Sequence, residues 1–121
     1  MSGWTLRQLA ELLAFPVAIA AGQILFKRAA MQVGTTAGSH WLVDLLTLPV
    51  MWLALALYGG ATILWVKILT TVPLSRAYPF VALAFVLVPA AGYLFFSEPI
   101  TPRYVIGAAI IIAGVLVAAQ G

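Results

Sequence analysis

Four long apolar runs are the feature that most limits what this chain can become. They cover residues 9–26, 50–69, 77–96 and 104–119, and each approaches the roughly 20 residues that a helix needs to cross a bilayer. Only 7% of the 121 residues are charged, whereas a soluble domain usually has about a quarter. None of the runs alternates apolar with polar residues, as a membrane β-barrel would require. The sequence therefore predicts an all-α membrane protein with four transmembrane helices.

The connections between the runs differ in length. The second (residues 70–76) and the third (97–103) are short, which predicts antiparallel helix hairpins. The first (27–49) is long. It contains the turn-forming stretch VGTTAGS, then SHWLVDLLTLP, which predicts a short interfacial helix with Ser39 as its N-cap. No internal repeat is evident, so residues 1–121 are expected to form a single four-helix domain.

The first apolar run allows an alternative interpretation as a signal peptide. Arg7, the stretch LLAFPVAIA and the small residues Ala18 and Ala20 together resemble the pattern of such a peptide and its cleavage site. The apolar stretch continues past that site as far as Lys27, which is the length of a span. We therefore expect the first run to form a transmembrane helix.

Composition argues against several other classes of function. The net charge of +3 comes from six scattered basic residues that form no nucleic-acid-binding patch. The chain has no cysteine and one histidine, so we expect no metal site. The sequence shows no nucleophile with a nearby base, no carboxylate pair and no phosphate-binding glycine loop. We therefore expect neither an enzyme nor a cofactor.

The basic residues do not decide the orientation in the membrane. Because the number of spans is even, both termini lie on one side. Three basic residues fall on each side: Arg7, Lys67 and Arg76 with the termini, and Lys27, Arg28 and Arg103 opposite them. The positive-inside rule then gives no bias. Either an insertion partner sets the orientation, or the chain inserts both ways and permits an antiparallel homodimer, or a buried Arg76 should not be counted.

Arg76 is the first candidate functional residue, because it stands directly before the third apolar run. One interpretation is an interfacial arginine whose side chain snorkels to the membrane surface. The other is a phosphate contact, since a guanidinium offers a planar fork of donors. Pro73 and Pro79 should also loosen the start of the helix and leave free backbone groups for an anion. The hydroxyl of Tyr78 would lie nearby.

Glu98, Gln23 and Lys27 are the other candidates. Glu98 begins the third connection, where it could pair with Arg103, cap the fourth helix or meet a substrate amine. Gln23 lies well inside the first run and could join two helices through a hydrogen bond or line a polar cavity. Lys27 follows one turn later on the same helix face.

Three stretches carry a resemblance to known transporters: AGQILFKRA in the first run, VPLSRAYPF entering the third, and SEPITPRYVIGAAIIIAGV through the fourth. Together they make up 37 of the 121 residues. They resemble the small multidrug resistance-like branch of the drug/metabolite transporter superfamily, and within it the subunits of the flippase for 4-amino-4-deoxy-L-arabinose-phosphoundecaprenol. The resemblance implies four helices per chain and two chains paired around a shared path. It also implies movement of an undecaprenyl-phosphate-linked aminosugar across the bacterial inner (cytoplasmic) membrane for lipid A modification.

The chain departs from the pattern of its relatives at three positions. Ile19 stands where the drug exporters carry a proton-exchanging glutamate, and Val81 stands where a tryptophan is expected after the third-span tyrosine. Both departures argue against a multidrug exporter. The aminoarabinose flippase subunits usually have an apolar residue where this chain has Arg76, so a flippase for another polyprenyl-phosphate sugar is an alternative.

The residues and the resemblance together predict a lipid-linked sugar flippase that works as a homodimer or with a second small subunit. The phosphate is expected to meet Arg76 and Lys27. Tyr78 and Gln23 are expected to contact the headgroup, and Glu98 to meet its amine. One alternative is a small-cation exporter that uses Glu98 as its carboxylate. Another is a non-transporting subunit of a larger membrane complex.

Overall fold

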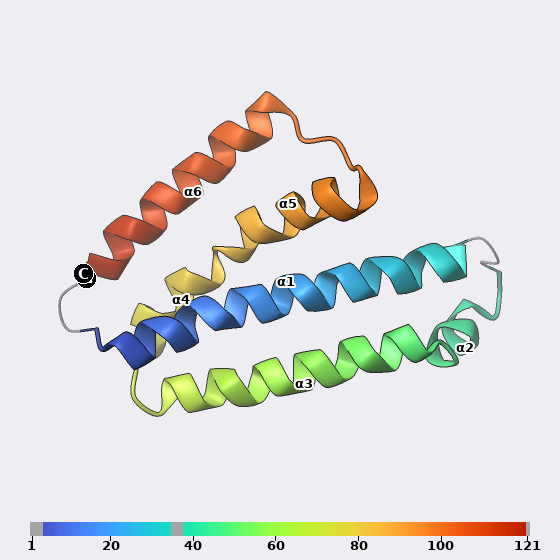
Figure 1. The fold of residues 1–121 in the computed structure, drawn as a ribbon, viewed down its shortest axis with the longest axis horizontal. Helices are drawn as coiled ribbons and strands as arrows, with labels where there is room; N and C mark the ends of the chain where they lie inside the picture. The colour runs from blue at the N-terminus through green and yellow to red at the C-terminus, as the bar shows by residue number, and fades with distance from the viewer. Residues whose placement is uncertain (1–3, 35–37, 121) are drawn as a thin grey trace.

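Within the described residues, 4–34 and 38–120, the computed structural model of the chain forms six α-helices (Figure 1). Four helical segments there are long and apolar enough to cross a membrane: α1, α3, α4 together with α5, and α6. This confirms the four predicted spans and describes a multi-pass membrane protein. The helices are α1 (Leu6–Gly34), α2 (Trp41–Leu46), α3 (Pro49–Leu69), α4 (Leu74–Val81), α5 (Ala84–Phe96) and α6 (Pro102–Gln120).

α1 is longer than the first apolar run. Its 29 residues extend about 43 Å at the usual rise, which exceeds a hydrocarbon core of roughly 30 Å. The helix continues through Lys27 and Arg28 because both residues favour helices, and it ends at Gly34, a residue that disfavours them. The connection to the second span is therefore shorter than expected. Within its turn-forming stretch, residues 35–37 lie outside the described residues.

The predicted short helix between the first two spans is present as α2, but the prediction of its N-cap was wrong. α2 begins at Trp41, the residue before it is His40, and no side chain caps its start. Ser39 lies one position too far upstream to cap the first free amides of this helix. At the other end, the indole Nε1 of Trp52 donates to the carbonyl of Leu46 at 2.7 Å and ties α2 to α3.

The third span consists of two helices, α4 and α5, rather than one. It begins at Leu74, directly after Pro73, so Arg76 lies inside the first turn of α4 and not in the preceding loop. The amides of Arg76 and Ala77 both donate to the carbonyl of Pro73, so these two amides are not free for an anion. Around the break, residues 82–86 make i-to-i+3 hydrogen bonds typical of a 3₁₀ turn.

Most buried side chains gather at the end of the bundle that holds the amino terminus of α1. Trp4 packs edge-on against Phe80 there, and its indole Nε1 donates to the carbonyl of Ala119 at 3.2 Å. At the opposite end, α6 diverges from α5 (Figure 1). The bundle is therefore closely packed at one end and open at the other. The core residues are Leu12, Phe15, Ala61, Ile68, Val72, Ala77, Phe80 and Ala119.

Candidate functional site

A cavity of about 180 Å³ lies at the open end, between α1 and the end of α5. We call it the headgroup cavity, after the ligand group that three of its lining residues were predicted to contact. The structure brings three of the five predicted site residues together around it: Gln23, Lys27 and Glu98. The remaining lining residues are Ala20, Ile24, Val88, Gly92 and Phe96.

Lys27 and Glu98 form an ion pair in this cavity. The Nζ of Lys27 lies 3.2 Å from Oε2 of Glu98, and the two side chains are 46% and 47% exposed. The expectation that Glu98 pairs with Arg103 or caps the fourth helix was wrong. At the start of α6, the hydroxyl of Thr101 instead accepts a hydrogen bond of 3.1 Å from the amide of Tyr104.

The backbone after α5 explains why Glu98 turns toward α1. Ser97 adopts the left-handed conformation with φ of 54°, which reverses the chain, and the amide of Glu98 then donates to the carbonyl of Gly92 at 3.3 Å. A Cβ on Gly92 would overlap the Oε1 atom of Glu98. Gly92 is therefore the residue that makes room for this carboxylate, and sequence reasoning missed it.

Gln23 joins α1 to α3. Its side-chain amide donates to the hydroxyl of Tyr58, which confirms the predicted interhelical hydrogen bond. The Tyr58 ring lies against Gly22, where a Cβ would come within 2.6 Å of its Cδ2 atom. The ring also contacts Phe26, with a distance of 5.0 Å between the ring centroids. Tyr58 was missed from the sequence, where the only available signal was a tyrosine in the middle of an apolar run.

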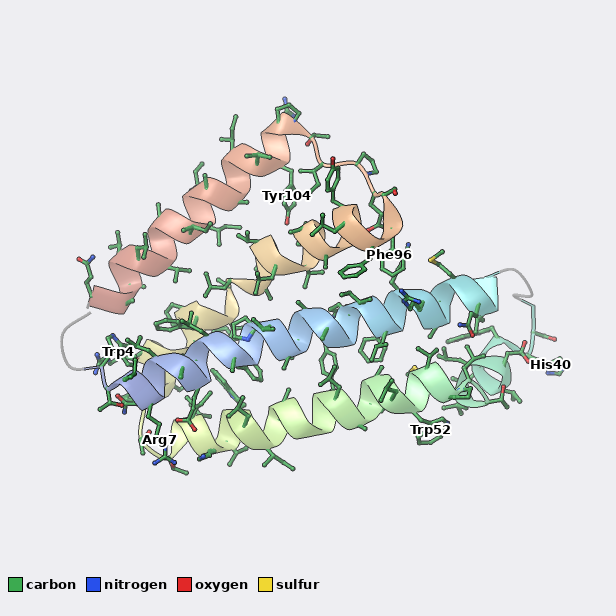
Figure 2. All side chains as sticks on the ribbon, in the orientation of Figure 1. Trp4, Arg7, His40, Trp52, Phe96 and Tyr104 are labelled. Carbon is green, nitrogen blue, oxygen red and sulfur yellow. The ribbon has the colours of Figure 1, made fainter. Side chains whose placement is uncertain are left out.

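Arg76 and Tyr78 lie at the packed end, away from the headgroup cavity. The guanidinium carbon of Arg76 stands 4.3 Å from the centre of the Trp4 ring, and its Nε is buried without an acceptor among the described residues. Tyr78 is largely exposed and contacts Trp65. Figure 2 shows Trp4 and Phe96 toward opposite ends of the bundle.

The separation of the two groups decides what they can do together. Along α1, Lys27 is about 30 Å from the helix start beside which Arg76 lies, given a rise of ~1.5 Å per residue. One phosphate cannot contact both side chains at the same time. The structure therefore divides the five predicted residues into a set of three in the headgroup cavity and a pair at the packed end.

Comparisons with known proteins show the family to which this chain belongs. Over 101 residues the chain is 33% identical to a protein of Hamiltonella defensa subsp. Acyrthosiphon pisum named "Probable 4-amino-4-deoxy-L-arabinose-phosphoundecaprenol flippase subunit ArnE". The match covers 81% of this chain and 91% of that protein. The chain belongs to the ArnE family of flippase subunits. This is the family that the three stretches of sequence indicated.

Relatives with the same name from Salmonella paratyphi B and Salmonella newport are 41% identical to the chain over 69 residues. Those matches cover 55% of this chain and 62% of each Salmonella protein, so the chain spans somewhat less than two thirds of their length. The relatives are named as subunits of a flippase, which is a transporter, and not as enzymes. No protein-family profile matches the chain, and no solved structure matches it.

Proposed function

We propose that this chain is a subunit of a flippase that moves an undecaprenyl-phosphate-linked aminosugar across the bacterial inner membrane, for modification of lipid A or another envelope glycan. The observation that carries the proposal is the Lys27–Glu98 ion pair in the headgroup cavity. A 4-amino-4-deoxy-L-arabinose phosphate carries the same two charges, an anionic phosphate and a cationic amine. Each charge of the headgroup can take the place of one partner in the pair.

In this mechanism Lys27 binds the phosphate and Glu98 binds the amine. Gln23, which lines the same cavity, is placed to bind a sugar hydroxyl. The ion pair is half-exposed, so opening it costs only about 0–1 kcal/mol. Charge-assisted hydrogen bonds to the ligand contribute about 1.5–3 kcal/mol each. Exchange of the internal pair for contacts with the headgroup is therefore favourable.

Arg76 and Tyr78 would act on the same headgroup at the opposite membrane surface. Arg76 lies on α4 with its guanidinium over the ring of Trp4. Its Nε is buried and meets no acceptor among the described residues. In this proposal Lys27 binds the phosphate at one membrane surface, and Arg76 binds it at the other.

The relatives are named as subunits, and we propose that this chain likewise works with a second copy or a second small subunit. The exposed face of α6 supports this proposal. Ile106 and Ile110 are each more than half exposed, and added Cβ atoms at Gly107 and Gly114, on the same side of the helix, would meet no neighbour within 4 Å. Small residues of this kind allow another helix to approach closely.

The structure does not favour the alternative of a small-cation exporter. Such an exporter needs a carboxylate that is free to exchange a proton for a substrate cation. Glu98 already faces the ammonium of Lys27, which would compete with the incoming cation. Proton release from the purified protein on addition of a quaternary ammonium compound would nevertheless support the exporter over the flippase.

Ligand-dependent thermal stability of the purified protein tests the proposal. Aminoarabinose-phosphoundecaprenol should raise the unfolding temperature of the wild type more than undecaprenyl phosphate does. Lys27→Gln should reduce the shift for both lipids, whereas Glu98→Gln should reduce only the part that requires the amine. Arg28→Gln and Asp44→Asn are the matched controls, because neither residue lines the cavity. Equal shifts in all variants, or no shift in the wild type, would refute the proposal.

A further inference from the structure

A groove between α5 and α6 is distinct from the headgroup cavity. It has a volume of about 270 Å³, and Tyr104 is the one residue with a polar side chain among those that line it. Its walls include Pro89 and Ala90 from α5, and Ala108 and Ile112 from α6. We call it the α5–α6 groove.

A third cavity of about 250 Å³ lies between the groove and the headgroup cavity. That cavity shares Gln23 and Val88 with the headgroup cavity, and it shares Pro89 and Tyr104 with the α5–α6 groove. The three spaces therefore form one row, which begins at the Lys27–Glu98 pair and ends between two apolar helices.

The polar groups at the junction of the groove satisfy each other. Pro89 has no amide hydrogen, so the carbonyl of Phe85, four residues earlier, loses its helical donor. The hydroxyl of Tyr104 replaces that donor at 2.5 Å and links α6 to α5 (Figure 2). With this bond made, the groove presents hydrocarbon to an occupant and suits an apolar chain better than a headgroup.

We infer that the α5–α6 groove binds the first isoprene units of the polyprenyl chain while the headgroup occupies its cavity. This inference rests on the proposed function. The ligand is one molecule with a charged head and an apolar tail, and the row of cavities changes from charged to apolar in the same order. A groove of about 270 Å³ is short compared with a polyprenyl chain, so it takes only the first isoprene units.

Tyr104 is a positioning residue in this arrangement, because it holds α6 at the distance that keeps the groove open. The remaining isoprene units leave the groove between the two helices and enter the bilayer. The protein thus shields only the headgroup and the start of the tail.

Tryptophan substitution of the groove wall tests the inference. Ala108→Trp fills the groove, whereas Ala113→Trp, five positions later and about 140° around α6, does not line it. Binding of aminoarabinose-phosphoundecaprenol and of tail-free aminoarabinose phosphate is measured for each purified variant. We expect Ala108→Trp to bind the lipid at least tenfold more weakly and the tail-free ligand as the wild type does. Ala113→Trp should bind both normally.

The outcomes separate the two proposals. If the wild type binds both ligands but Ala108→Trp leaves lipid affinity unchanged, the tail site is refuted and the proposed function stands. If the wild type binds neither ligand, both fail.

Single-cysteine variants provide a readout that does not depend on filling the groove. The chain has no cysteine, so Ala108→Cys and Ala113→Cys each introduce a unique thiol. Added lipid should slow maleimide labelling of Ala108→Cys severalfold and leave Ala113→Cys unchanged. Protection of Ala108→Cys that increases with protein concentration, without added lipid, would assign the groove to an interface between chains and overturn the inference.

Discussion

Replacing Gly92 with alanine should separate ligand binding from the stability of the fold. Gly92 lies in the last turns of α5, and a Cβ there would overlap Oε1 of Glu98. The clash involves the far end of a flexible, half-exposed side chain, so the carboxylate can move away without disturbing the helix. The movement would take it from the position in which it faces Lys27.

Two changes in the stability of Gly92→Ala are expected, and they have opposite signs. Loss of the half-exposed ion pair costs about 0–1 kcal/mol. Alanine is more favourable than glycine inside a helix by about 1 kcal/mol. The free energy of unfolding of Gly92→Ala should therefore stay unchanged or rise by up to about 1 kcal/mol. Loss of the charged contact to the amine should cost about 1.5–3 kcal/mol in binding, roughly a tenfold to hundredfold weaker affinity.

Thermal unfolding and lipid binding, measured on the same purified preparations, check both parts. Gly60→Ala in α3 is the matched control, because a Cβ there meets nothing within 4 Å and the residue lines none of the cavities named above. It should show the helical gain and normal binding. The reasoning fails if Gly92→Ala binds the aminosugar lipid as the wild type does, or if it unfolds more easily while Gly60→Ala does not.

Two further predictions concern the hydrogen bonds between helices. Tyr58→Phe removes the hydroxyl that accepts the hydrogen bond of Gln23 and should lower the free energy of unfolding by about 0.6–1.7 kcal/mol. Denaturant titration in detergent measures this difference. No change would mean that the bond contributes nothing to stability. Tyr104→Phe should lower the free energy of unfolding by about 1–3 kcal/mol, because the Phe85 carbonyl loses its donor. The loss should be much smaller in a Pro89→Ala background, because the backbone amide of the introduced alanine can then donate to that carbonyl in place of the hydroxyl. A double-mutant cycle measures this coupling, and strictly additive costs would contradict it.

Hydropathy predicted the spans because it depends on each segment alone. A run of about 20 apolar residues needs lipid and must satisfy its own backbone, so the four helices follow without knowledge of their neighbours. The same reasoning did not predict the break between α4 and α5. Pro79 and Pro89 flank that break, but apolar composition continues across it without interruption.

The candidate site was predicted only as a set of residues. Gln23, Lys27 and Glu98 stood out because polar groups are costly in or beside a membrane span, and the structure places all three around one cavity. Arg76 stood out for the same reason, yet it lies at the other end of α1. The energetic cost of a polar side chain near the membrane does not tell which end of the bundle that residue occupies.

The sequence by itself determined that this protein lies in a membrane, how many spans it has and the family to which it belongs. The tertiary structure decided which polar groups meet. Glu98 reaches Lys27 because Ser97 reverses the chain in the left-handed region and Gly92 leaves space for the carboxylate. Both conditions depend on how α5 and its loop pack against α1, and no pattern within a single helix contains that information.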